Sequence, residues 1–267
     1  MNRVDKKFRE LKKYKRSAFI AYVTAGDAGL SVTGRIVLAL ERSGVDIIEL
    51  GIPFSDPIAD GPVIQAASHR ALQKKVTLKK IFSFVRNLRR DTDIPLVFMT
   101  YYNPVLRYGV ERFIKGCKDN GVDGVIIPDL PHEEAGDLIR YAKRDGVATI
   151  FLAAPTSTKN RIKSIIRNST GFIYYVSITG VTGARSILPP EIALNVRKIR
   201  SMTKKPVAVG FGISEPGQAR SMARIADGVI VGSAIIKIIA TGQKNEKMMI
   251  SKVERFTKKL AKAIHND

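Results

Sequence analysis

The sequence has few of the residues that build disulfide frameworks and metal centres. One of its 267 residues is cysteine, three are histidine and none is tryptophan. A lone Cys117 cannot form an intramolecular disulfide, so the chain needs no oxidising compartment. The histidines lie in separate segments without HxxxH or CxxC spacing, so we expect no metal site at His69, His132 or His265.

Long hydrophobic runs are also absent. No apolar run approaches the ~20 residues of a membrane span, and the charged segment from Met1 to Arg16 lacks the apolar centre of a signal peptide. We therefore expect a cytoplasmic protein that makes no membrane contact.

Acidic residues are scarce relative to basic ones. The chain has 24 Asp and Glu against 45 Lys and Arg, which gives a net charge of +21 and a pI of about 10.2. Such a surface attracts nucleic acid, membrane headgroups, acidic proteins or phosphorylated substrates. The basic residues are spread through helical segments without a nucleic-acid-binding motif, and the aromatics lie in strand-like runs rather than between them. We therefore do not expect nucleic acid as a ligand.

Short β-branched or aromatic runs recur, each followed by a turn signal and a segment with helical spacing of apolar residues. This alternation predicts βα units and a parallel sheet. We expect strands at Phe19 to Val23, Asp46 to Leu50, Pro95 to Thr100, Gly124 to Pro128, Val147 to Leu152, Phe172 to Val176, Val207 to Phe211 and Gly228 to Val231.

About eight such units in roughly 250 residues, with no linker between them, favour a closed (β/α)8 barrel of the TIM type over a doubly wound sheet. We expect a single α/β domain over residues 1–267. Val4, Phe8 and Leu11 share one face of an N-terminal segment and predict an extra helix at the bottom of the barrel. A C-terminal stripe predicts a helix on the barrel wall, through Ile250, Val253, Phe256, Leu260 and Ile264.

The segment from residue 49 to 61, ELGIPFSDPIADG, holds two acids in contrasting settings. Side chains alternate along a strand, so Ile47, Glu49 and Gly51 share one face. An inward Glu49 would lie at the C-terminal end of its strand, where barrel active sites are found, and burial there raises a carboxyl pKa towards working pH. The alternative is a structural Glu49 that snorkels towards solvent or pairs with a nearby arginine.

Asp60 follows a loop that Pro53 and Pro57 stiffen. A rigid loop can aim a carboxylate at a ligand. Asp is equally a preferred N-cap residue before a helix that begins with proline, so Asp60 or Asp56 can instead cap the helix that starts near Pro62.

Glycine-rich loops follow three successive strands, at VGFGIS (209–214), VGSA (231–234) and GVTGAR (180–185). Glycines allow backbone N–H groups to approach an anion, and a helix N-terminus adds partial positive charge. Without a GxGxxG or a P-loop motif, the pattern predicts a small phosphate ester rather than a nucleotide.

These residues closely resemble the α subunit of tryptophan synthase, an indole-3-glycerol-phosphate lyase. The match runs from FIAYVTAGD (19–27) through the segment 49–61 to Gly232-Ser233-Ala234. The resemblance implies retro-aldol cleavage of indole-3-glycerol phosphate to indole and glyceraldehyde 3-phosphate, without a cofactor in this chain. It implies that Glu49 is the general acid and base, and that Asp60 hydrogen-bonds the indole N–H.

The remaining site residues are also carried over from the resemblance. It implies phosphate binding at Gly183, Gly212, Gly232 and Ser233. It implies an indole pocket and lid at Tyr22, Thr100, Ile127, Tyr174, Thr182 and Phe211.

The resemblance implies a partner as well, a β subunit that carries pyridoxal phosphate and receives the indole in an α2β2 assembly. The implied docking residues are Pro53, Phe54, Asp56, Tyr102, Asn103 and Pro104. Two alternatives stay open: a stand-alone lyase that releases free indole, and a barrel that has lost catalysis and binds polyanions. The charge of +21 is well above what the family leads us to expect.

Overall fold

The computed structural model describes residues 1–176, 190–210 and 212–265. Nine strands form one parallel sheet: β1 Ala18–Thr24, β2 Ile47–Gly51, β3 Leu96–Met99, β4 Gly124–Ile126, β5 Ala148–Ile150, β6 Leu152–Ala153, β7 Ile173–Val176, β8 Val207–Gly210 and β9 Gly228–Val231. The order across the sheet is β5-β4-β3-β2-β1-β9-β8-β7-β6.

The two ends of this order, β5 and β6, are consecutive segments separated by Phe151 alone, so the sheet closes into a barrel. The prediction of one strand from Val147 to Leu152 is therefore wrong, because two short strands, β5 and β6, occupy this segment. β5 pairs with β4 and β6 pairs with β7, while the carbonyl of Phe151 accepts from the Tyr174 N–H at 3.1 Å. The strand divides where its hydrogen bonding passes from one neighbour to the other.

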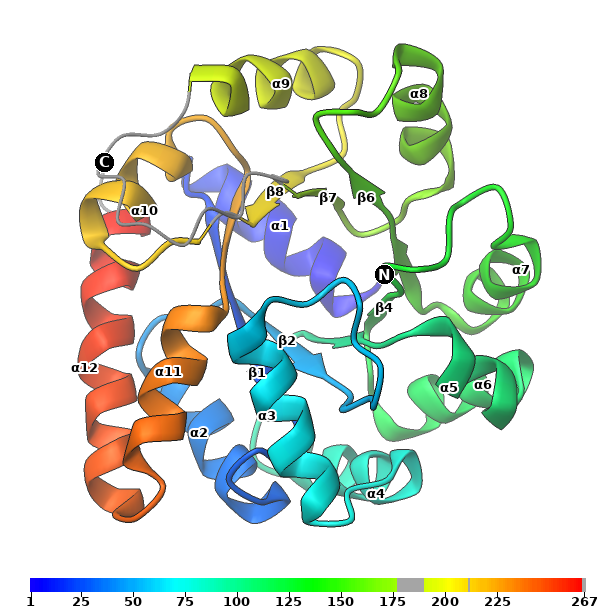
Figure 1. Ribbon diagram of the computed structural model, residues 1–267. Helices are drawn as coiled ribbons and strands as arrows, with labels where there is room; N and C mark the ends of the chain where they lie inside the picture. The colour runs from blue at the N-terminus through cyan, green and yellow to red at the C-terminus, as the bar shows by residue number, and fades with distance from the viewer. Residues whose placement is uncertain (177–189, 211, 266–267) are drawn as a thin grey trace.

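Helices surround the strands (Figure 1). The described residues include α1 Arg3–Lys13, α2 Leu30–Arg42, α3 Pro62–Gln73, α4 Leu78–Leu88, α5 Tyr102–Tyr108, α6 Val110–Asn120, α7 Gly136–Asp145, α8 Lys159–Asn168, α9 Pro190–Ser201, α10 Pro216–Ala223, α11 Ser233–Gly242 and α12 Glu246–His265. None of them is long and apolar enough to cross a bilayer. We propose that residues 1–267 form one domain, since all nine strands join one sheet.

The predicted N-terminal helix is confirmed as α1, which lies across the middle of the barrel in Figure 1. Asn2 caps it by accepting from the Val4 N–H at 2.9 Å. Its buried face carries Val4, Phe8 and Leu11, and the Phe8 ring lies 5.7 Å from the ring of Phe172 at the start of β7. The bottom of the barrel is thus covered by apolar side chains.

Strand alternation divides the core into an inner and an outer part. On β2, Ile48 and Leu50 face the outer layer between strands and helices, whereas Ile47 joins the inner cluster. Glu49 shares the face of Ile47, as predicted. The inner cluster contains Val4, Phe8, Leu11, Ala18, Ile20, Ile47, Val97, Ile126, Ile150, Phe172, Tyr174, Ala208 and Ile230.

The predicted C-terminal helix is α12, which packs against α2, α10 and α11. Val253, Leu260 and Ile264 are buried there, as the stripe predicted, whereas Ile250 and Phe256 are half-buried. His265 near its end contacts the Asp46 carboxylate at 2.9 Å and so fixes the helix to the start of β2.

Candidate functional site at the C-terminal end of the barrel

Glu49 lies inside the barrel near the C-terminal end of β2, with 1% of its surface exposed. Its neighbours in the sheet are Tyr22 on β1 and Val97 on β3. Its Oε2 atom has no hydrogen-bond partner among the described residues. Burial first, and then the negative charge of Asp60, raise the pKa of Glu49 to about 8. No basic side chain in the described part of the chain contributes to this shift, which argues against the predicted alternative of a structural arginine pair there.

Asp60 stands at the end of the loop between β2 and α3 and is half-buried. Burial raises its pKa to about 6, and a hydrogen bond with the Tyr101 hydroxyl opposes the rise. Gly61 occupies the N-cap of α3 without a side-chain cap, and Pro62 begins the helix. The alternative in which Asp60 or Asp56 caps this helix is therefore wrong, and the Asp60 carboxylate is left for another role.

Tyr22 and Tyr174 form walls around the two carboxyl groups. Burial first, and then the charges of Asp60 and Glu49, raise the pKa of both phenols. Glycines let the rings approach the neighbouring strands. A Cβ at Gly51 would lie 2.1 Å from the Tyr22 hydroxyl, and one at Gly210 would lie 2.7 Å from the Tyr174 hydroxyl. The phenols and carboxyls therefore share one enclosed region.

Thr100 and Ile127 follow β3 and β4 and are buried. Within the described ranges, the Thr100 Oγ1 atom has no hydrogen-bond partner, like Oε2 of Glu49. Buried polar atoms in proteins are nearly always paired, so two unpaired ones at neighbouring strand ends indicate a place for a polar ligand.

The predicted phosphate loops are described in part. Gly212, after β8, has a φ of 32°, and no atom lies within 4 Å of a Cβ built there. Gly232 is the N-cap of α11, which begins at Ser233 and has neither a side-chain cap nor an acidic residue in its first turn. Such a helix start suits an anion. Gly183, Thr182 and Phe211 lie outside the described residues.

The predicted docking residues lie in two segments that contact each other. Pro53, Phe54 and Asp56 belong to the loop that leads to Asp60, and the Phe54 ring lies 5.3 Å from the Tyr101 ring. Tyr102, Asn103 and Pro104 form the first turn of α5. The Asp129 carboxylate accepts from the Tyr102 N–H at 2.9 Å and so holds this turn beside the loop after β4.

Two residues of this region were not singled out from the sequence. The Tyr101 hydroxyl accepts from the Ala59 N–H at 3.0 Å and also contacts the Asp60 carboxylate. Asp27, in the loop after β1, is buried and receives a bidentate pair from Arg70 of α3 and a hydrogen bond from Gln243 after α11. Both join segments far apart in the chain. The one local signal was that Tyr101 directly follows a predicted strand.

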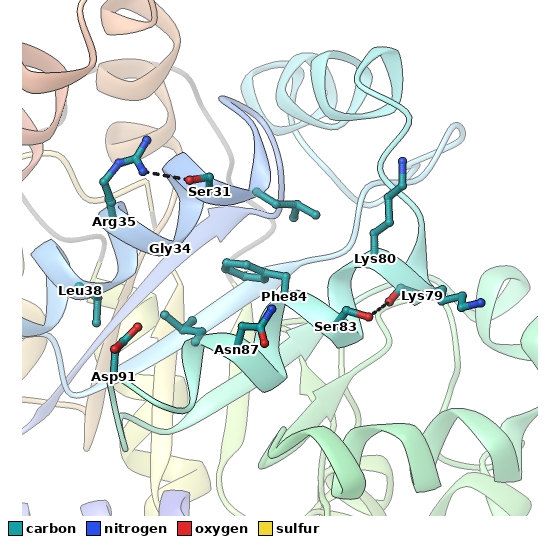
Figure 2. Close-up of a pocket in the computed structure, with 12 residues that line it drawn as sticks. Ser31, Gly34, Arg35, Leu38, Lys79, Lys80, Ser83, Phe84, Asn87 and Asp91 are labelled. Carbon is teal, nitrogen blue, oxygen red and sulfur yellow. Dashed lines mark hydrogen bonds between the residues drawn. The ribbon is translucent and has the colours of Figure 1, made fainter.

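A groove of about 680 Å3 lies away from this site, on the outer wall between α2 and α4 (Figure 2). Phe84 stands in the middle, with Ser31 and Arg35 on α2 and Asn87 on α4 around it. None of the predicted site residues lines the groove.

Among the described residues, no group of three or more His, Cys, Asp or Glu side chains is arranged to hold a metal ion. The groups present in this region are the buried carboxyl of Glu49, the half-buried carboxyl of Asp60 and the uncapped start of α11, which suit proton transfer, charge placement and anion binding.

Comparison with known proteins agrees with this geometry. A family model described as "Tryptophan synthase alpha chain" matches residues 8–265. The chain is 51% identical to the tryptophan synthase alpha chain of Geotalea daltonii, over 89% of this chain and 90% of the relative. It is 49% identical to that of a Thermoanaerobacter species, over 99% and 100% of the two chains.

Solved structures show the same fold. Tryptophan synthase subunit alpha from Legionella pneumophila has a TM-score of 0.92 at 36% identity and covers 99% of this chain and 98% of its own. A chain of the tryptophan synthase complex from Pyrococcus furiosus has a TM-score of 0.82 at 40% identity, over 90% and 98% of the two chains. The protein therefore belongs to the tryptophan synthase alpha chain family, a family of lyases in tryptophan biosynthesis.

Proposed function

We propose that this chain cleaves indole-3-glycerol phosphate to indole and glyceraldehyde 3-phosphate by a retro-aldol reaction. The observation that carries the proposal is the buried carboxyl of Glu49, whose pKa is about 8 and whose Oε2 is unpaired among the described residues, together with an Asp60 whose pKa is about 6. Between these values one acid is protonated while the other is ionised.

Glu49 begins as the acid and gives its proton to C3 of the indole ring. The resulting carboxylate then takes the proton of the hydroxyl on the adjacent side-chain carbon. As the C–C bond breaks, its electron pair returns to the ring, and the hydroxyl oxygen becomes the oxygen of the aldehyde. Glu49 ends protonated as it began, so the cycle requires no cofactor in this chain.

Asp60 accepts a hydrogen bond from the indole N–H. Protonation at C3 places positive charge on the ring nitrogen, and a fixed carboxylate there stabilises the intermediate more than the substrate. The hydrogen bond with Tyr101 supports this role because it opposes the rise of the pKa of Asp60 and keeps the carboxylate ionised.

The substrate phosphate binds at Gly212, Gly232, Ser233 and Gly183. The uncapped start of α11 supports the part of this assignment that is described. Tyr22, Thr100, Ile127 and Tyr174 line the indole pocket, and Thr182 and Phe211, assigned to the same pocket and its lid, lie outside the described residues.

We also propose that the chain works with a pyridoxal-phosphate β subunit in an α2β2 assembly. The two docking segments carry Ile58 and Leu106, large apolar side chains with exposures of 81% and 57%. Large exposed apolar side chains on both segments favour a protein interface. The contacts from Phe54 to Tyr101 to Asp60 link this surface to the site. A cytoplasmic location goes with this role.

Indole release from indole-3-glycerol phosphate tests the proposal, measured with and without a β subunit. We expect indole from the wild-type chain, a higher rate with the β subunit, and co-purification of the two. Full activity without any complex would favour the stand-alone lyase. No indole under either condition would reject the proposed reaction.

A further inference from the structure

The N-terminal end of the barrel, opposite the carboxyl groups, carries basic residues from segments far apart in sequence. The segment Lys15 to Ser17 leads into β1, and the Ser17 hydroxyl donates to the carbonyls of Ala223 and Ala226 at 2.7 and 2.8 Å. Next along the rim, the Asp227 N–H donates to the Val207 carbonyl at 2.8 Å, beside the loop that holds Lys204. We call this the basal surface, formed by Lys12, Lys13, Tyr14, Lys15, Arg16 and Lys204.

The cations of the basal surface have no carboxylate partner in the described part of the chain. All five are exposed. The nearby acids are already paired, since Glu10 bonds Lys7 at 3.2 Å and Asp227 bonds Arg200 at 3.0 Å. The surface therefore presents positive charge that the fold does not use.

Tyr14 stands among these cations with 67% of its surface exposed. It is an exception to the expectation that aromatics lie in strand-like runs rather than between basic residues. The turn that presents it is fixed, because the Leu11 carbonyl accepts from the N–H groups of Tyr14 and Arg16 at 3.1 and 2.9 Å. An aromatic ring held in solvent between cations matches the stacking platforms of single-strand-binding proteins.

Neither the helix dipole nor a protein interface accounts for the whole of this arrangement. Basic residues near the end of α1 complement the helix dipole, which explains the presence of Lys12 and Lys13. The dipole does not require Lys15, Arg16 or an exposed tyrosine. Protein interfaces are poor in lysine, whereas phosphate backbones are bound by lysine and arginine alike.

We propose that the basal surface binds single-stranded nucleic acid, with its cations on the phosphates and Tyr14 stacked on a base. This reverses the expectation from sequence that nucleic acid is not a ligand. Because the surface lies at the other end of the barrel from Glu49, binding there leaves the lyase site open.

The test is fluorescence polarisation of a labelled oligouridylate of about 12 nucleotides, with the full chain at several salt concentrations. The variant Lys13→Glu/Lys15→Glu is compared with Lys258→Glu/Lys259→Glu, which makes the same charge change at exposed positions of α12. We expect the basal variant to lose about tenfold or more in affinity and the α12 variant about twofold or less. Equal losses would show diffuse charge attraction and overturn the proposal.

Tyr14→Ala and Tyr14→Phe test the stacking. We expect the alanine variant to lose about fivefold or more in oligouridylate affinity and the phenylalanine variant to bind like wild type. Binding of heparin, which has no bases, should not change in either. An unchanged affinity of Tyr14→Ala for oligouridylate, or tighter binding to anionic lipid vesicles than to oligouridylate, would overturn the assignment. Circular dichroism spectra and melting curves that match those of wild type show that each variant is folded, whatever its catalytic activity.

Discussion

Two buried carboxyl groups lie at opposite ends of the barrel, and their surroundings differ. Asp123, 5% exposed at the start of β4, accepts from the Leu96 N–H and from Arg89 at 2.9 Å each, and from Arg3 at 3.1 Å. Burial raises its pKa, and these three donors oppose the rise. Glu49, at the other end, has an unpaired oxygen and no basic side chain to oppose the rise.

The difference separates a structural acid from a reactive one. Donors around Asp123 come from α1, from the end of α4 and from β3, so its hydrogen bonds hold these segments together. At Glu49, the raised pKa and an Oε2 that is unpaired among the described residues leave a proton that the carboxyl can give and take back. Active sites often carry such a cost in stability.

The largest expected effect is on catalysis. Glu49→Gln removes the exchangeable proton and should lower kcat of indole release by about a thousandfold, while substrate binding is kept. Asp123→Asn is the matched change from buried acid to amide, and its activity per folded molecule should stay near wild type. Near-normal turnover of Glu49→Gln would contradict the role of Glu49.

For stability, the larger loss is expected at Asp123 rather than at Glu49. Asp123→Ala leaves Arg89, whose side chain is 10% exposed, without its carboxylate. We expect a loss of about 3–5 kcal/mol in the free energy of unfolding, measured by urea denaturation. A loss below about 1 kcal/mol, the range of exposed ion pairs, would show that the arginines find other partners.

The free energy of unfolding should depend on pH because of Glu49. The pKa of Glu49 is about 8 in the folded state and ~4.3 in the unfolded chain, so the folded state holds the proton more tightly. Wild-type stability is therefore lost as pH rises through this window. Between about pH 5 and 8, Glu49→Gln should gain roughly 2–4 kcal/mol relative to wild type. Parallel stability curves in urea titrations would contradict the assigned shift.

Asp60 should show its influence on Glu49 in the pH profile of kcat/KM. We expect the rate to rise through about pH 6 as Asp60 ionises and to fall above about pH 8 as Glu49 loses its proton. Asp60→Asn should lower the rate less than Glu49→Gln does. It should also move the alkaline limb to lower pH, because the charge that raises the pKa of Glu49 is gone. An unmoved limb would mean that the two groups do not interact.

The smallest effect is expected at Tyr101. Tyr101→Phe removes a hydrogen bond that lowers the pKa of Asp60, so the acid limb should move to higher pH with a loss of about tenfold or less in rate. Tyr102→Phe, one residue further on, is the control, because the Asp129 carboxylate contacts the Tyr102 backbone. Equal profiles for both variants would remove Tyr101 from the site.

Local patterns in the sequence predicted most of the fold, because strands and helices are specified largely by residues that are neighbours in the chain. The alternation that turns Glu49 inward with Ile47 is a property of one strand. Such patterns could not predict the break in the strand at Phe151 or the role of Tyr101. The division at Phe151 depends on pairing with Tyr174, and the contact of Tyr101 with Ala59 spans 42 residues. Local signals also suited Asp60 as a helix cap, but the N-cap position of α3 is occupied by Gly61.

The helix α1 closes the N-terminal end of the barrel. Phe8 packs against Phe172 there, so apolar side chains close this end of the barrel to a small product. Under the proposed function, indole would have to leave towards the C-terminal end, where the loop of the proposed docking residues leads to Asp60, and a docked partner could therefore influence when the product is released.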